Sequence, residues 1–184
     1  MANDTDLQQV REACKTFPAR FQTLHLGTVG ADGLPEASYA PYVSEGGRYY
    51  VYLSDLARHS ANLLATGRAS VLFIEGEAQA KHLFARERLT LACQAAECAR
   101  TTPRFEAVMD RFDARFGKFM QAIRPLRDFR LFELLPLSGS YVAGFARAYT
   151  LAGDDLDQLR HRQEQGHQAP DAVTERRLSE QLPG

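Results

Sequence analysis

The chain has 184 residues, of which 45% are hydrophobic and 24% charged, a mixture typical of one globular domain with its own core. Its 22 basic and 23 acidic residues give a formal net charge of −1, which excludes an overall attraction for nucleic acid or an anionic membrane. Any anion-binding site must therefore be a local cluster.

The first third of the chain predicts a helix followed by hairpin-linked strands. Apolar residues recur at near-helical spacing behind an Asn-Asp-Thr cap, which predicts an amphipathic helix over residues 5–17, ended by Pro18. The apolar period then changes to two, and Gly33 provides the positive φ that a hairpin turn requires. Strands are predicted over residues 21–29, 35–43 and 48–54.

The middle of the chain alternates further strands with helices. Residues 56–65 predict a short helix, and strands are predicted over residues 69–75 and 88–99. Thr102-Pro103, an N-cap followed by a proline suited to the first turn, opens a second main helix. Residues 118–124 are expected to continue it for another turn or two.

The last third predicts closing strands and a charged end. FRLFELLP and SGSYVAGFARAYTL predict two or three strands, with Ser138-Gly139 as the turn. Residues 153–167 predict a small charged helix. We therefore expect a barrel domain over residues 1–152 and a C-terminal helix with a flexible tail over residues 153–184. Six or seven strands with short peripheral helices favour a mainly β, α+β fold, an antiparallel sheet closed into a small barrel.

Cysteines, termini and the usual catalytic motifs narrow the class of protein further. Cys14, Cys93 and Cys98 have no zinc-type spacing and favour reduced thiols. With no signal peptide and no apolar stretch of ~18 residues, we expect a cytoplasmic protein that does not span a membrane. G-x-S-x-G, G-x-G-x-x-G and Walker sequences are missing, and no two of the five histidines have the i, i+4 spacing of a metal pair.

The stretch Arg58-His59-Ser60, with Asn62 close by, places four hydrogen-bonding side chains where a predicted strand meets a predicted helix. Free N–H groups at a helix N-terminus attract anions, and an arginine adds a bidentate donor. One reading is a site for the anionic end of a ligand. The other is structural, with Ser60 as the N-cap and Arg58 in solvent.

Two other features also leave a structural and a functional reading open. Strand alternation places Arg86 and Arg88 on one face, where either a ligand's anionic groups or the nearby Glu75 and Glu77 neutralise them. His167 follows a glycine and precedes a polar tail. It is therefore either a solvated residue or a ligand that a flexible arm brings to a cofactor.

Five segments carry a family resemblance: TLHLGTVGADGLPEASYAPYV, YYVYLSDLARHSANLL, ASVLFIEGEAQAKHLFARERLTLACQA, RFDARFGKFMQAIRPLRDFRLFELLPLSG and GFARAY. Together they resemble the heme-utilisation, heme-degrading branch of the pyridoxamine 5′-phosphate oxidase-like, FMN-binding split-barrel superfamily, over roughly residues 8–150. The resemblance implies a six-stranded split β-barrel that forms a homodimer, with cofactor sites in the clefts between protomers.

For the flavin-binding relatives, the resemblance implies that the strand-to-helix junction binds the FMN phosphate. The matching residues here are Arg58, His59, Ser60 and Asn62, and His59 stands where a lysine is commoner.

For the heme branch, the resemblance implies heme in the dimer cleft, with its iron ligated by a histidine of the C-terminal segment. Here that ligand is His167, in preference to His161. An arginine of the R-x-R-L-T strand lies by the heme, which matches Arg88 and places Arg86 beside it. The aspartate of D-F-R-L-F, Asp128, falls next to the cleft, and we hypothesise that it pairs with a histidine of the junction, His59, across the interface.

These features favour a heme-binding protein of iron acquisition that degrades heme as an oxygenase or passes it on. Heme needs an apolar slot, an imidazole for iron and cations for two propionates. If the family activity carries over, bound heme is reduced, its iron activates O₂ and the ring opens at a meso carbon, with electrons from an external donor. Two alternatives remain: an FMN-dependent oxidoreductase acting on a small molecule such as a pyridoxine phosphate, and a non-enzymatic heme or flavin carrier.

Overall fold

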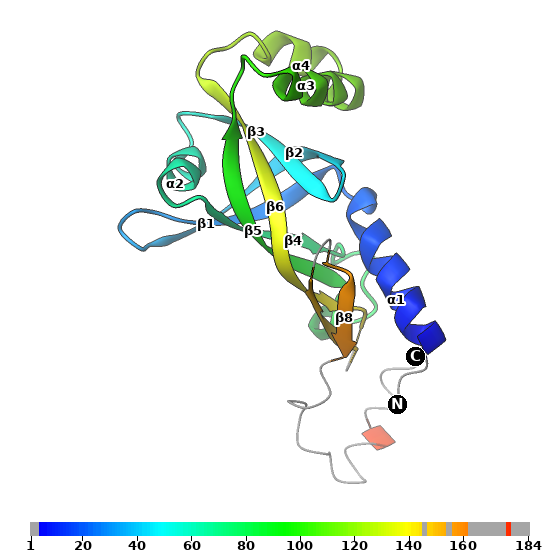
Figure 1. Ribbon diagram of the computed structural model, residues 1–184. Coiled ribbons are helices and arrows are strands. Elements are labelled where there is room, and N and C mark those ends of the chain that lie inside the picture. Colours follow the sequence, from blue (N-terminus) through cyan, green and yellow to red (C-terminus); the bar gives the residue numbers. More distant parts are fainter. Residues whose placement is uncertain (1–3, 145–146, 154–155, 162–175, 178–184) are drawn as a thin grey trace.

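The computed structural model describes residues 4–144, 147–153, 156–161 and 176–177. Its strands form one antiparallel sheet in the order β3-β2-β1-β4-β5-β6-β7-β8, and β3 also pairs with β6. That additional pairing closes β1 to β6 into the expected six-stranded barrel, and β7 and β8 extend the sheet beyond it (Figure 1). The strands are β1 Thr23–Val29, β2 Pro35–Glu45, β3 Arg48–Ser54, β4 Arg68–Ile74, β5 Arg88–Cys98, β6 Phe129–Val142, β7 Ala148–Ala152 and β8 Gln158–His161.

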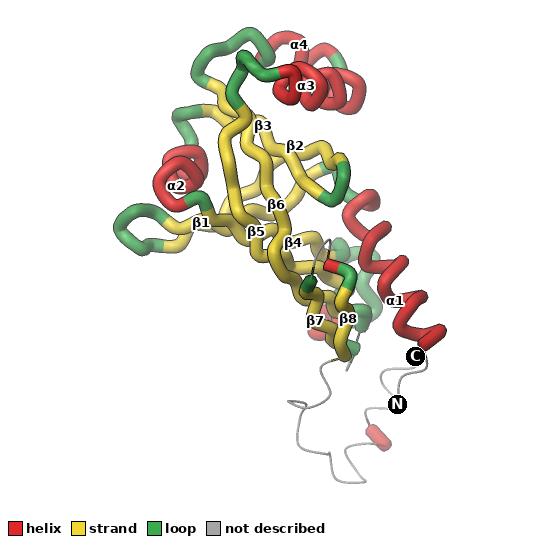
Figure 2. The backbone as a smooth tube through the Cα atoms, viewed as in Figure 1, coloured by secondary structure: helices red, strands yellow, loops and turns green. Residues whose placement is uncertain are grey.

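Four α-helices among the described residues surround the barrel. α3 and α4 lie together at one end, α2 lies beside β1 and β5, and α1 lies on the other side (Figure 1 and Figure 2). No helix of the described part of the chain is long and apolar enough to cross a membrane. The helices are α1 Asp4–Thr16, α2 Arg58–Thr66, α3 Pro103–Phe116 and α4 Lys118–Ile123, with 3-10 turns η1 Phe17–Arg20 and η2 Leu83–Ala85.

Strand β3 is buried on both faces, which explains the aromatic richness of its sequence, RYYVYLS. Val51 and Leu53 point into the barrel and join the larger hydrophobic cluster. Tyr50 and Tyr52 point to the opposite face and pack in a second cluster against α3, including Phe112. The side-chain period of two therefore divides one strand between two cores.

The expected turn at Ser138-Gly139 is wrong, because β6 runs without interruption from Phe129 to Val142. The long β5 pairs with β6 along its length, with one register shift between Ala92 and Cys93. Gly139 is in this ladder because of close packing: a Cβ there would lie 3.0 Å from the Thr90 carbonyl oxygen. This glycine is therefore required by close packing between strands and does not mark a turn.

The expected helix over residues 153–167 is also wrong over Gln158–His161, which form strand β8. Leu159 faces Leu151 across the β7–β8 pair, and both side chains are buried. The exposed Gln158 and Arg160 on either side of Leu159 complete a strand alternation, and pairing with the open edge of β7 satisfies their backbone groups. Residues 154–155 and 162–167 of the expected helix, including His167, and most of the tail lie outside the described residues.

Candidate functional site at the junction of β3 and α2

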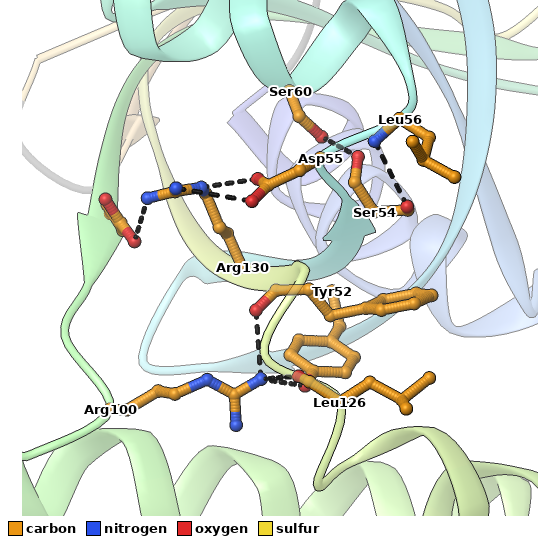
Figure 3. Close-up of polar contacts among 10 residues, drawn as sticks. Tyr52, Ser54, Asp55, Leu56, Ser60, Arg100, Leu126 and Arg130 are labelled. Carbon is orange, nitrogen blue, oxygen red and sulfur yellow. Dashed lines mark hydrogen bonds and ion pairs between the residues drawn. The ribbon is translucent and has the colours of Figure 1, made fainter.

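The junction between β3 and α2 is fastened by the side chains of its own serines (Figure 3). The Ser60 hydroxyl donates to the Ser54 carbonyl oxygen at 2.7 Å, and the Leu56 amide donates to the Ser54 hydroxyl at 3.2 Å. The N-cap is the extended residue Ala57, so the structural reading of Ser60 as the N-cap is wrong. Ser60 instead ties the first turn of α2 back to the end of β3.

Two of the four predicted anion-binding side chains point into the protein. Ser60 is 1% exposed and Asn62 is 7% exposed. The Asn62 side-chain amide donates to the Thr28 hydroxyl at 3.0 Å and to Glu36 Oε2 at 3.1 Å. These groups hold α2 against the hairpin of β1 and β2, and their hydrogen bonds are already formed within the chain.

Arg58 and His59 are the two cluster residues that reach the surface. The Arg58 side chain is 71% exposed, and its Nε lies 3.5 Å from Glu36 Oε2. His59 is half-buried, with Nδ1 2.9 Å from the Ser38 hydroxyl. Burial lowers the pKa of the His59 imidazole below its ordinary value, and the Glu36 carboxylate opposes this by raising it. The junction therefore contains its own negative charge.

Replacing that charge gives a pH-dependent prediction. In Glu36→Gln, the amide oxygen still accepts from Asn62, but the carboxylate that favours the imidazolium form is gone. The pKa of His59 is therefore expected to fall further, measured by NMR titration of the ring protons. Glu12→Gln, on the exposed face of α1, is the matched control and should leave the pKa of His59 unchanged. An unchanged or raised pKa in Glu36→Gln contradicts the assignment.

Glu36 was not identified from the sequence. It reaches the junction because the hairpin register places it opposite Thr28, beside the Asn62 that follows on α2. The three-residue turn Ala31-Asp32-Gly33 would have located it, because counting outward from that turn through Gly30 and Leu34 pairs Thr28 with Glu36.

Arg86 and Arg88 do not share a strand face. β5 begins at Arg88, so Arg86 lies in the connection before it, which corrects the expectation from alternation. Arg86 Nε donates to the Glu75 carbonyl oxygen at 2.7 Å, and its Nη1 lies 3.5 Å from Glu77 Oε1. The expected neutralisation by Glu77 is therefore confirmed for Arg86.

Arg88 differs from Arg86 in its charge environment. It is partly buried, and its Nη1 donates to the Arg86 carbonyl oxygen at 3.1 Å. It takes part in none of the ion pairs formed among the described residues. A partly buried guanidinium without a carboxylate partner in that part of the chain is suited to bind an anionic ligand group.

Asp128 belongs to the same region of the fold as the α2 junction. It lies in the connection between α4 and β6, with its side chain exposed. Its carbonyl oxygen accepts from the Asp55 amide at 2.6 Å. Asp55 in turn receives two hydrogen bonds from Arg130, of 2.5 and 3.3 Å. The pairing of Asp128 with His59 across an interface stays a prediction.

Of the two candidate iron ligands, the structure describes His161 but not His167. His161 lies on β8, with its ring 4.9 Å from that of Tyr149 in an edge-on contact. Its Nδ1 is buried without a hydrogen-bond partner among the described atoms. His167 lies outside the described residues, so its role stays a prediction. No group of three or more metal-ligating side chains occurs in the described part of the chain, but heme iron needs only an axial ligand.

A broad groove of about 1060 Å³ runs over the outer face of the barrel beside the junction. Small side chains of neighbouring strands line it, among them Ala37, Ser70 and Ala92, and Glu36 lines it as well. Exposed Leu137 completes the lining. Such a surface permits close approach of a flat ligand or of another sheet.

Comparison with known proteins places these observations in context. The family model described as pyridoxamine 5′-phosphate oxidase matches residues 10–143. The heme oxygenase HutZ of Vibrio cholerae serotype O1 is 41% identical over 153 residues, which are 83% of this chain and 86% of that protein.

Two solved structures resemble the chain over most of its length. A crystal structure described as HutZ, the heme storage protein from Vibrio cholerae, has a TM-score of 0.64 at 38% identity and covers 70% of this chain and 88% of that chain. Campylobacter jejuni ChuZ has a TM-score of 0.77 at 28% identity and covers 88% of this chain and 64% of that chain.

Proposed function

Because the chain belongs to the pyridoxamine 5′-phosphate oxidase family, and a relative 41% identical to it is named a heme oxygenase, we propose that this protein binds heme and degrades it in iron acquisition. The observation that carries the proposal is the likeness to HutZ over 83% of the chain. An external donor supplies the electrons.

The residues available in the structure fit a heme ligand. Arg88 offers a partly buried cation for a propionate, and the groove beside the junction offers apolar surface of sufficient size. We assign the axial ligation of iron to His167. When bound, heme supplies the iron that activates O₂.

The remaining roles belong to side chains of the chain itself. Arg88 orients the ligand through its propionate, as a planar bidentate donor does. Asp128, paired with His59 of the second protomer, orients that imidazole toward the ligand, and burial lowers the pKa of His59 and so favours its neutral form. Arg58 lies at the wall of the site, and Ser60 and Asn62 hold the start of α2 in place behind it.

FMN is the alternative ligand, and the charge at the junction argues against it. The Glu36 carboxylate already accepts from Asn62 and lies 3.5 Å from Arg58 Nε. A phosphate dianion placed on the same donors would meet this like charge at close range, which is unfavourable in a partly buried site. A heme whose propionate binds Arg88 avoids that repulsion.

We further propose that two copies of the chain form the functional unit. Small side chains on an outer sheet face line the groove, and Leu137, which also lines it, is 57% exposed. Packing of this face against a second copy would remove that apolar surface from water and bring His59 of one protomer toward Asp128 of the other.

Hemin titration of the purified chain tests the proposal. We expect an intense absorption band at about 400 nm that saturates at one heme per chain. Light scattering should give the mass of two chains. Added ascorbate should then bleach the band, whereas a carrier would keep it. A parallel titration with FMN should leave flavin fluorescence unquenched. Binding of FMN without any hemin response contradicts the proposal.

A further inference from the structure

Arg100, between β5 and α3, gathers the backbone of a distant segment around its guanidinium (Figure 3). Its Nη1 donates to the Arg124 carbonyl oxygen at 3.0 Å. Its Nη2 donates to the Phe129 carbonyl oxygen at 3.0 Å and also to the Leu126 carbonyl oxygen. Three carbonyl groups between the end of α4 and the first residue of β6 thus converge on one side chain.

The guanidinium is itself fixed in place by aromatic neighbours. Arg100 Nη2 donates to the Tyr52 hydroxyl at 2.6 Å, and Cζ lies 5.8 Å from the Tyr52 ring centre and 5.1 Å from that of Phe105. Both rings belong to the buried cluster between β3 and α3. A planar fork with five donors can serve several acceptors at once while stacking on rings, whereas a lysine ammonium has three donors and no such plane.

The segment that Arg100 holds ends at the α2 junction. Asp128, its exposed acidic residue, is bound there through its carbonyl oxygen by the Asp55 amide at 2.6 Å. Arg130 holds Asp55 with a two-pronged contact and also bonds Glu97 at 3.0 Å (Figure 3). Arg100 therefore binds the segment at both of its ends, and Arg130 restrains the Asp55 whose amide binds Asp128.

From this geometry we infer that Arg100 is a positioning residue that fixes the segment 124–129 and so sets the place of the Asp128 carboxylate at the proposed ligand site. The inference rests on the proposed function for the role of Asp128, but the restraint on the segment stands on the contacts alone. Without Arg100, three carbonyl groups lose a charged donor and accept hydrogen bonds from water instead. The segment then gains conformational freedom.

Limited trypsin digestion of the ligand-free protein tests the restraint. Arg127 is exposed within the segment, whereas Arg124 precedes a proline and resists trypsin, so cleavage after Arg127 reports release of the segment. We expect Arg100→Lys to increase the rate of this cleavage about tenfold or more, as for loss of a charged hydrogen bond. Arg111→Lys, which changes an arginine of α3 that pairs with Glu45, is the matched control and leaves the rate unchanged. Equal rates in wild type and Arg100→Lys overturn the inference.

A double-mutant cycle tests the coupling to Asp128. The pH profile of the hemin absorption band should shift in Arg100→Lys in the same direction as in Asp128→Asn. In the Asp128→Asn background, Arg100→Lys should produce no further shift. Full additivity of the two shifts overturns the positioning role. If no variant binds hemin at all, the proposed function fails, and the trypsin result still decides the restraint.

Discussion

Phe73→Ala is expected to lower the free energy of unfolding by about 3–5 kcal/mol, the range for deleting a large buried aromatic side chain. Phe73 is 1% exposed inside the barrel. Its ring centre lies 5.3 Å from that of Tyr42, 5.5 Å from that of Tyr49 and 5.7 Å from that of Phe21. The substitution therefore removes the ring shared by three aromatic contacts and leaves a cavity that the closed barrel cannot easily collapse.

Urea unfolding monitored by circular dichroism measures this effect. Phe84→Ala is the matched control, because Phe84 is 98% exposed and its loss should change the free energy of unfolding by less than about 0.5 kcal/mol. Equal destabilisation by the two substitutions would show that Phe73 does not occupy a closed core.

His167→Ala is expected to remove the axial ligand of heme iron and thereby change the hemin absorption spectrum and weaken binding by about tenfold or more, the cost of losing a bond worth at least about 1.4 kcal/mol. This expectation derives from the proposed function, in which one histidine of the C-terminal segment approaches the ligand. Absorption and resonance Raman spectra of the hemin complex measure the ligation state without reference to turnover.

His161→Ala separates the two histidine alternatives. Its ring packs edge-on against Tyr149 on the β7–β8 pair, so its loss is expected to perturb that pairing and leave the iron ligation spectrum intact. A wild-type spectrum in His167→Ala together with an altered one in His161→Ala would transfer the ligand assignment to His161. Altered spectra in both variants would indicate that the strand pair itself contributes to the site.

Elements that depend on neighbours in sequence were predictable. α3 begins where Thr102 predicts it, because the Thr102 hydroxyl accepts from the Phe105 amide and Pro103 suits the first turn. β3 covers the predicted residues 48–54, because its aromatic run and the glycines that precede it are both local signals. The density of hydrogen-bonding side chains at residues 58–62 was also visible in the sequence, and the binding of a ligand by these residues stays a prediction.

Features that depend on pairing with another strand were not predictable in this way. Whether Gly139 ends a strand depends on how long β5 continues beside it. Whether Leu159 belongs to a helix or a strand depends on the open edge of β7.

What the sequence by itself determined was the set of local elements and the residues that could bind an anion, because caps, turns and side-chain periods act over a few residues. Only the tertiary structure decided the charges those residues meet. The hairpin register places Glu36 against Arg58 and Asn62, and barrel closure places Arg100 against the segment that carries Asp128. Such contacts arise from the packing of residues distant in sequence. Local sequence patterns do not specify which distant residues will come into contact.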